Sequence, residues 1–124
     1  MAAAATGILR LVAALVLTLA LPVGALAQDE GETAAEIQYL LDFVAASNCT
    51  FIRNGTAHDP VDAAAHLRLK YSRGKKYVNS AEQFIDRLAS ESSWTGQPYT
   101  VDCDGKTQPS RDWFYRALDE YRQH

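Results

Sequence analysis

Two histidines and two adjacent serines are the side chains of this chain that could support hydrolysis. A Ser-His-Asp hydrolase could use Ser92 or Ser93, His58 or His66, and Asp59 or Asp62. The sequence has no G-x-S-x-G nucleophile elbow and no recognisable oxyanion loop. The favoured interpretation is that Ser92 and Ser93 terminate or cap the third helix, where serine hydroxyls bond to the backbone. A small hydrolase therefore stays an alternative, and we assign no catalytic residue.

The same histidines could be metal ligands. His58 and His66 have Asp59 and Asp62 nearby, and His124 would be a remote third nitrogen. The chain lacks an HExxH motif and an i,i+4 histidine pair on one helical face, so the spacing matches no metal motif. Asp62, His66 and Lys70 fall on successive turns of one helical stripe, which more simply predicts a charge ladder. We expect no metal and no other cofactor.

A basic segment, RLKYSRGKKY at 68–77, contains five cations interleaved with tyrosines: Arg68, Lys70, Arg73, Lys75 and Lys76. Such a patch could bind phosphate, lipid headgroups or an acidic polymer of the cell envelope. Alternatively, these cations complete a helix C-terminus, where they oppose the negative end of the helix dipole. Beyond residue 27 the chain has eleven Lys plus Arg against fifteen Asp plus Glu, which argues against nucleic acid as a partner.

The first 27 residues have the layout of a secretory signal peptide. Arg10 precedes the apolar run LVAALVLTLAL at 11–21, and Pro22 and a small-residue site follow. Cleavage is expected between Ala27 and Gln28. The apolar run is much shorter than the roughly 20 residues of a membrane-spanning helix, so no permanent membrane anchor is expected. Residues 28–124 are then a single small globular domain in the periplasm or secreted.

Hydrophobic periodicity and capping residues predict four helices and two strands in this domain. The helices are expected over 32–47, from Pro60 to about Arg73, from Ser80 to about 90, and from Ser110 to about 121. Asp59 is the expected N-cap of the second helix, Ser80 forms a capping box with Gln83, and Ser110 is expected to cap the last helix. The strands are expected at 50–53 and 99–103, each ending at a turn pair, Asn54-Gly55 or Asp104-Gly105. The fold class is α+β, mostly helical, with a two-stranded antiparallel ribbon and the order α-β-α-α-β-α.

The two cysteines constrain how the strands pair. Cys49 precedes the first strand and Cys103 ends the second, and an oxidising compartment favours a disulfide over two free buried thiols. A bridge is easiest if the strands are antiparallel neighbours. Phe51 would then face Val101, and Arg53 would face Tyr99.

This pairing gathers residues that could bind a small anionic or sugar-like ligand or a peptide end: Arg53, Asn54, His58, Ser93, Trp94 and Tyr99. They would offer a cation, amide and hydroxyl donors and an aromatic wall. The alternative is architectural, with Arg53 and Asn54 holding the 92–98 loop in place by hydrogen bonds.

Four ordered segments, FIRNG (51–55), AHLRLKY (65–71), SAEQFIDRLAS (80–90) and SSWTGQPY (92–99), resemble the YfeK-like family of small exported bacterial proteins. The resemblance covers about residues 36–122 and implies a periplasmic or secreted bacterial protein. The family has no assigned activity, so the resemblance supplies no catalytic residue. We expect a non-enzymatic binding or interaction module, whose partner is a small anionic or envelope ligand or another periplasmic protein. The alternatives are the hydrolase above and an envelope-associated protein that uses residues 68–76.

Overall fold

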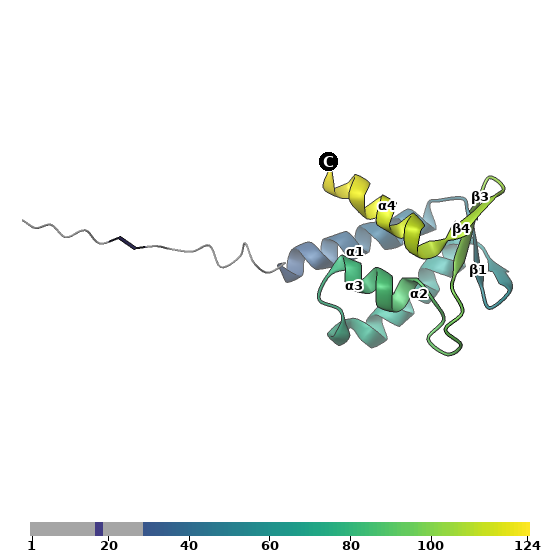
Figure 1. Cartoon of the computed structure of the whole chain (residues 1–124), viewed down its shortest axis with the longest axis horizontal. Coiled ribbons are helices and arrows are strands. Elements are labelled where there is room, and N and C mark those ends of the chain that lie inside the picture. Colours follow the sequence, from purple (N-terminus) through teal and green to yellow (C-terminus); the bar gives the residue numbers. More distant parts are fainter. Residues whose placement is uncertain (1–16, 19–28) are drawn as a thin grey trace, which may run out of the picture.

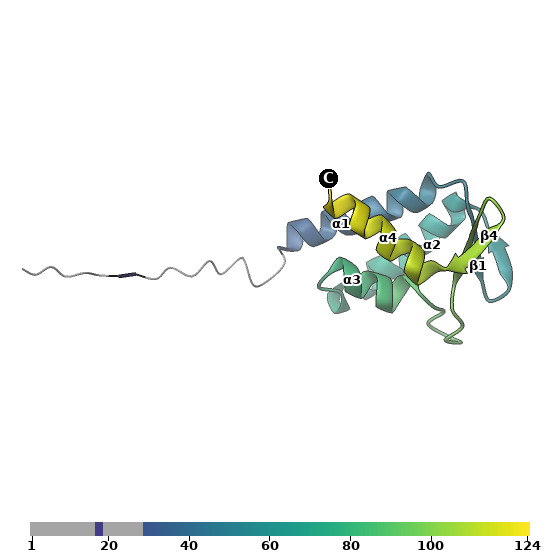
Figure 2. The same cartoon turned by 45° about the horizontal axis from the view of Figure 1, so that its top comes forward.

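The computed structural model describes residues 17–18 and 29–124, and the second of these ranges folds into helices and one antiparallel sheet. Apart from residues 17–18, the predicted signal peptide lies outside the described residues, as does its cleavage site. Figures 1 and 2 show the helices packed together, with the sheet at the end of the helical layer away from the start of α1. The predicted α+β class is confirmed.

The predicted helices are present. They are α1 (Glu30–Ala45), α2 (Pro60–Gly74), α3 (Ala81–Phe84) and α4 (Ser110–Arg122). A 3₁₀ turn, η2 (Lys75–Tyr77), follows α2, and α3 continues as one π-helical segment, η3 (Ile85–Ala89). The predicted order of helices and strand regions along the chain is therefore confirmed.

Capping side chains are found at three helix starts, those of Asp29 before α1, Asp59 before α2 and Ser80 before α3. Asp59 accepts a hydrogen bond from the Asp62 amide at 2.8 Å, directly before Pro60. Ser80 accepts from the Gln83 amide at 3.1 Å, as predicted for a capping box. The prediction that Ser110 caps the last helix is wrong, because Ser110 is already helical and Pro109 occupies the N-cap without a side-chain bond.

The sheet has four strands, which corrects the predicted two-stranded ribbon. They are β1 (Thr50–Arg53), β2 (Thr56–His58), β3 (Thr100–Cys103) and β4 (Lys106–Pro109), in the spatial order β2-β1-β3-β4. Each predicted strand is the first strand of a hairpin. Both residues of the Asn54-Gly55 and Asp104-Gly105 turns have positive φ, which matches tight hairpin turns.

The central strand pair has the predicted register. Phe51 lies opposite Val101 in the antiparallel β1–β3 pair. Continued beyond the last bonded pair, this register places Arg53 opposite Tyr99. Cys49 and Cys103 form the predicted disulfide, with their Cα atoms 4.6 Å apart.

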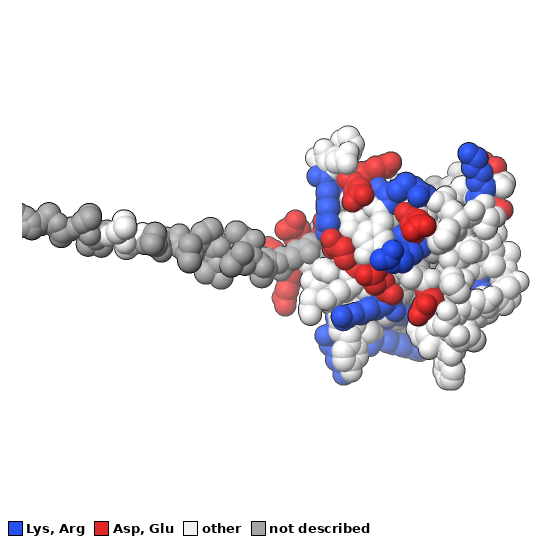
Figure 3. Space-filling view, in the orientation of Figure 1, with Lys and Arg blue, Asp and Glu red and all other residues white. Residues whose placement is uncertain are grey.

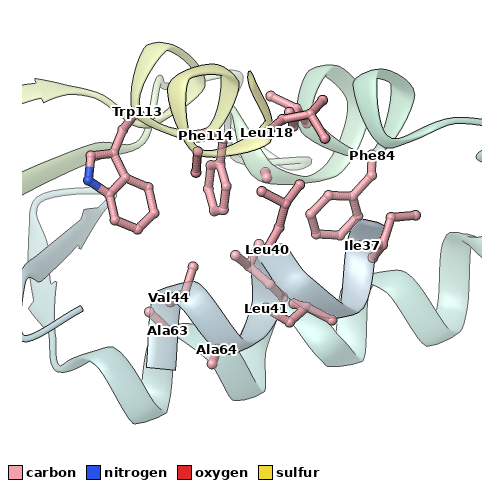
Figure 4. Packing of buried hydrophobic residues seen from close by; sticks show 14 of the residues in the cluster. Ile37, Leu40, Leu41, Val44, Ala63, Ala64, Phe84, Trp113, Phe114 and Leu118 are labelled. Atoms are coloured by element: carbon pink, nitrogen blue, oxygen red, sulfur yellow. The ribbon is translucent and has the colours of Figure 1, made fainter. Parts of the chain in front are cut away.

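The hydrophobic core lies between the helices and extends to one face of the sheet. Figure 4 shows Leu40 of α1, Phe84 of α3 and Phe114 of α4 converging there. At the sheet end, the Trp113 ring packs edge-on against Phe51, with ring centroids 5.4 Å apart. Because this packing fixes β1 against the helices, it also fixes the end of β1 where Arg53 lies.

An ion-pair network attaches the end of α4 to α1 and α3. Arg122 donates two hydrogen bonds to the Glu36 carboxylate, at 2.7 and 2.9 Å, and two to Glu82, at 2.8 and 3.0 Å. Glu36 is only 2% exposed. These hydrogen bonds raise the pKa of Arg122 above its ordinary value, so the guanidinium stays charged.

Arg122→Met is expected to lower the free energy of unfolding by about 2 kcal/mol, because it removes the guanidinium that compensates the buried Glu36 carboxylate. The value is below that of a fully buried pair because the Arg122 side chain is 36% exposed. Urea unfolding followed by circular dichroism measures it. The matched control, Arg111→Met, breaks an exposed pair with Asp86 and should cost less than about 1 kcal/mol. Equal losses of unfolding free energy in both variants would contradict a special stabilising role of the Arg122–Glu36 pair.

Candidate functional site

A cleft of about 470 Å³ opens where α2, the end of β1 and the loop after η3 meet. Its volume lies within the range of roughly 300–1,000 Å³ that is usual for small-molecule sites. One wall is a stripe of α2 at helical spacing, with His66, Leu69, Lys70 and Arg73. Arg53 enters from the end of β1.

All the charged side chains that line the cleft are basic. Arg53, Lys70 and Arg73 line it together with His66, and none of the described lining residues is Asp or Glu. The face of the molecule in Figure 3 is different, because acidic and basic side chains are interspersed over the helices there. The cleft is therefore a local concentration of positive charge on a chain with a formal net charge of −3.

Arg53 is the least satisfied of these cations. Its Nη1 atom is buried and has no hydrogen-bond partner among the described residues. Guanidinium N–H groups removed from water normally find a carboxylate, a phosphate or another acceptor, since a buried polar group without a partner costs about 1–3 kcal/mol. Arg53 is thus a residue of the cationic cleft with one buried donor that has no acceptor among the described residues.

The Tyr99 hydroxyl connects two side chains of α2 at the bottom of the cleft. Lys70 Nζ lies 3.2 Å from this hydroxyl and 3.2 Å from the Glu91 carbonyl oxygen, to which it donates. His66 Nε2 is 3.4 Å from the same hydroxyl. Burial raises the pKa of Tyr99, so the phenol remains protonated. These contacts position Lys70 without neutralising its charge.

The pKa values of two side chains of α2, His66 and Lys70, are lowered in the cleft. Burial, with the charges of Arg53 and Lys70, lowers the pKa of His66 to about 4, so the imidazole is neutral at pH 7. Burial and the charge of Arg53 lower the pKa of Lys70 to about 8, against a small opposing effect of Glu91. An anion in the cleft would oppose both shifts.

The loop at 92–97 is held by side-chain hydrogen bonds. The buried Ser92 hydroxyl accepts from the amides of Trp94 and Thr95 and from Asn54 Nδ2 at 3.4 Å. The Thr95 hydroxyl donates to Asn54 Oδ1 at 2.8 Å. Asn54 therefore holds the 92–97 loop by hydrogen bonds, which is the architectural alternative predicted for it from the sequence. No such bond to the loop is found for Arg53 among the described contacts.

The pinned loop presents Trp94 at the rim of the cleft, where the residue is 96% exposed. Leu69, on the α2 side, is also exposed. Large apolar side chains beside a cleft are typical of binding surfaces, because their burial by a partner is favourable.

Five of the six residues predicted as a ligand cluster line this cleft: Arg53, Asn54, Ser93, Trp94 and Tyr99. The sixth, His58, lies in β2 opposite Phe51 and outside the lining, although its charge contributes to the low pKa of His66. The cluster prediction omitted His66, Lys70 and Arg73. The i, i+4 and i+7 spacing of these three residues indicates that they share one face of α2, and this was the signal in the sequence that could have added them to the cluster.

The five cations of the basic segment do not share one surface. Lys70 and Arg73 line the cleft, whereas Lys75 and Lys76 line a second hollow, which Arg73 also borders. Arg68 forms an exposed ion pair with Asp42 of α1, 3.1 Å long. The cations of this segment therefore lie on different surfaces, and only Lys70 and Arg73 contribute to the cleft.

The alternative chemistries have less geometric support. No hydrogen bond joins a histidine to Ser92 or Ser93 within residues 29–124, and the Ser92 hydroxyl is occupied by the loop contacts above. The described residues contain no group of three or more potential metal ligands. The predicted charge ladder lacks an ion pair between Asp62 and His66, since His66 contacts Tyr99 instead. Among the helices described, none is long and apolar enough to cross a membrane.

Comparison with known proteins identifies the family. A model of a family of unknown function, DUF5329, matches residues 31–122, and the chain belongs to this family. The uncharacterized protein YfeK of Salmonella typhimurium (strain LT2) is 42% identical over 85 residues, which cover 68% of this chain and 71% of that protein. The resemblance found in the sequence is thereby confirmed. No solved structure matches the chain.

Proposed function

We propose that the protein is an exported, non-enzymatic binding module and that its cleft binds the anionic group of a small ligand. The observation that carries the proposal is the buried Arg53 Nη1 atom without an acceptor. Arg53 also lines the cleft, so a carboxylate, phosphate or sulfate oxygen bound there would be an acceptor for its guanidinium, because guanidinium groups bind such oxygens with short, charge-assisted hydrogen bonds.

The surroundings of Arg53 support an anion over a neutral ligand. Lys70 lies in the same cleft and its charge is not paired with a carboxylate among the described ion pairs. With His66 neutral at pH 7, Arg53, Lys70 and Arg73 are the charges that line the cleft. Burial and the charge of Arg53 both lower the pKa of Lys70, and a bound anion would oppose this shift.

Export is the other part of the proposal. The predicted signal peptide and the disulfide between Cys49 and Cys103 both fit an oxidising compartment outside the cytoplasm. Mass spectrometry of the protein recovered from the periplasm tests this part. A chain that begins at Gln28 supports it, and an uncleaved cytoplasmic chain contradicts it.

Calorimetric titration with inorganic phosphate and with acetate, at low ionic strength, tests the binding proposal. We expect saturable binding at one site that weakens with added salt. Glucose, which carries no charge, is the matched neutral probe and should not bind comparably. Absence of saturable binding of both anions would refute the proposed function.

The affinity for sulfate is expected to fall about tenfold as the pH rises through about 8, because Lys70 loses its proton there. The charged groups around Lys70 are Arg53 from β1 and Glu91 from the loop, and the neutral titratable groups near it are His66 of its own helix and Tyr99. A bound anion raises the pKa of Lys70. Sulfate affinity is therefore highest at pH values below the pKa that Lys70 has in the ligand-free protein, and it declines as the pH rises above that pKa. Sulfate keeps the same charge throughout, and titrations at several pH values measure the effect.

Lys70→Arg is the matched variant for this pH dependence. Arginine stays charged across the whole range, so the decline near pH 8 should disappear while binding at neutral pH is retained. A decline that persists in Lys70→Arg would assign the titration to another group and contradict this role of Lys70.

A further inference from the structure

Beyond its cationic floor, the cleft has an apolar wall that an inorganic anion would not use. Leu69 of α2 and Leu88 of η3 line one part of it, and Trp94 lies on the loop at the rim. Leu69 is 46% exposed, and Trp94 is almost fully exposed. Leu69 and Trp94 lie beside the cleft and outside the core, whereas Leu88 also packs against the core.

The volume of the cleft also favours a ligand larger than an inorganic anion. About 470 Å³ is room for a drug-sized molecule, and a single phosphate or carboxylate group fills only the region near Arg53. The remainder would hold water against Leu69 and Leu88, and a ligand body that displaced this water would gain hydrophobic free energy.

Trp94 is held in position by its loop, although its side chain is exposed. Its amide donates to the buried Ser92 hydroxyl at 3.2 Å, and Ser92 is in turn bonded to Asn54. The indole is solvent-exposed and offers a flat face, which stacks on aromatic rings and on the apolar faces of sugars.

We infer that the ligand is an anion attached to a ring, with the anionic group on Arg53 and Lys70 and the ring between Leu69 and Trp94. This inference rests on the proposed function and adds the class of ligand to it. The ring is either aromatic or a sugar pyranose, since both present a flat apolar face. A bare inorganic anion uses only half of the site, and a neutral ring lacks the partner for Arg53.

Phenyl phosphate, glucose 6-phosphate, hexyl phosphate and inorganic phosphate are the probes that test this inference. Calorimetric titration is expected to give at least tenfold tighter binding for phenyl phosphate or glucose 6-phosphate than for inorganic phosphate. Hexyl phosphate, whose chain has no flat face, should bind less tightly than the tighter of the two ring compounds. Trp94 fluorescence should change on saturation with the ring compound that binds.

Two variants test the apolar wall. Trp94→Ala should reduce ring-phosphate affinity about tenfold, to near that of inorganic phosphate, and leave inorganic phosphate binding unchanged. Leu69→Ser should act in the same direction on the opposite wall. Tyr77→Ala is the matched control, because Tyr77 is another exposed aromatic residue but lies outside the cleft, so its removal should leave all affinities unchanged.

The outcomes separate this inference from the proposed function. If inorganic phosphate binds and the ring phosphates bind no more tightly, the ring assignment is overturned while the anion site stands. If hexyl phosphate binds as tightly as the better ring compound and Trp94→Ala has no effect, the stacking role is overturned. If no phosphate compound binds, the proposed function fails and the ring assignment with it.

Discussion

Replacing Arg53 with methionine is expected to weaken phosphate binding about 100-fold, equivalent to about 2.7 kcal/mol, without destabilising the fold. Methionine keeps most of the side-chain volume but removes the guanidinium whose Nη1 atom has no partner among the described residues. Since an unsatisfied buried donor is unfavourable, the free energy of unfolding should stay the same or rise by about 1 kcal/mol. Calorimetric titration measures the first effect and urea unfolding the second.

Lys76→Met is the matched control for Arg53→Met. It makes the same change in net charge at an exposed position outside the cleft, so phosphate affinity should fall less than about twofold. The architectural interpretation of Arg53 makes the opposite prediction for Arg53→Met. A loss of about 2 kcal/mol in stability with unchanged phosphate affinity would support that interpretation and contradict ours.

Removal of the disulfide, by Cys49→Ala together with Cys103→Ala, is expected to lower the free energy of unfolding by about 4 kcal/mol. The bridge closes a separation of 54 residues, and the chain-entropy model gives a value of this size for such a loop. Small domains bury a limited fraction of their surface and depend correspondingly on such links. Urea unfolding of the oxidised protein and of the double variant measures the difference.

The position of the bridge gives this prediction a second readout. Cys49 and Cys103 join β1 and β3 at the end opposite to Arg53 and Tyr99. The double variant, wherever it is still folded, should therefore bind phosphate with unchanged affinity. Reduced wild-type protein is the control and should match the double variant in stability. A difference below about 1 kcal/mol between oxidised and reduced protein would contradict a major stabilising role.

Local signals in the sequence were sufficient to predict the helices and the central strand pair. Asp59 before Pro60 and Ser80 before Gln83 mark helix starts through hydrogen bonds that involve neighbouring residues only. The two cysteines added the one long-range constraint that fixed strand pairing and register. β2 and β4 were missed because TAH and KTQP are short, largely exposed runs without apolar alternation. Their pairing follows from hairpin turn geometry.

The candidate site could be predicted only in part from the sequence. The β1–β3 register correctly brought Arg53, Asn54 and Tyr99 to one end of the sheet, near the loop with Trp94. Helical spacing placed His66 and Lys70 on one stripe, but it contains no information about which part of the sheet that stripe approaches. The contacts of His66 and Lys70 with Tyr99 depend on how α2 packs, which is a property of the whole core.

NMR chemical-shift mapping with inorganic phosphate tests the central claim, an anion site at Arg53, most directly. The account predicts saturable shifts of the Arg53 side chain and of His66, Lys70 and Arg73, with much smaller shifts at Lys75 and Lys76. Shifts confined to Lys75 and Lys76, or no saturable shift at Arg53, would contradict the account and place anion binding, if any, outside the cleft.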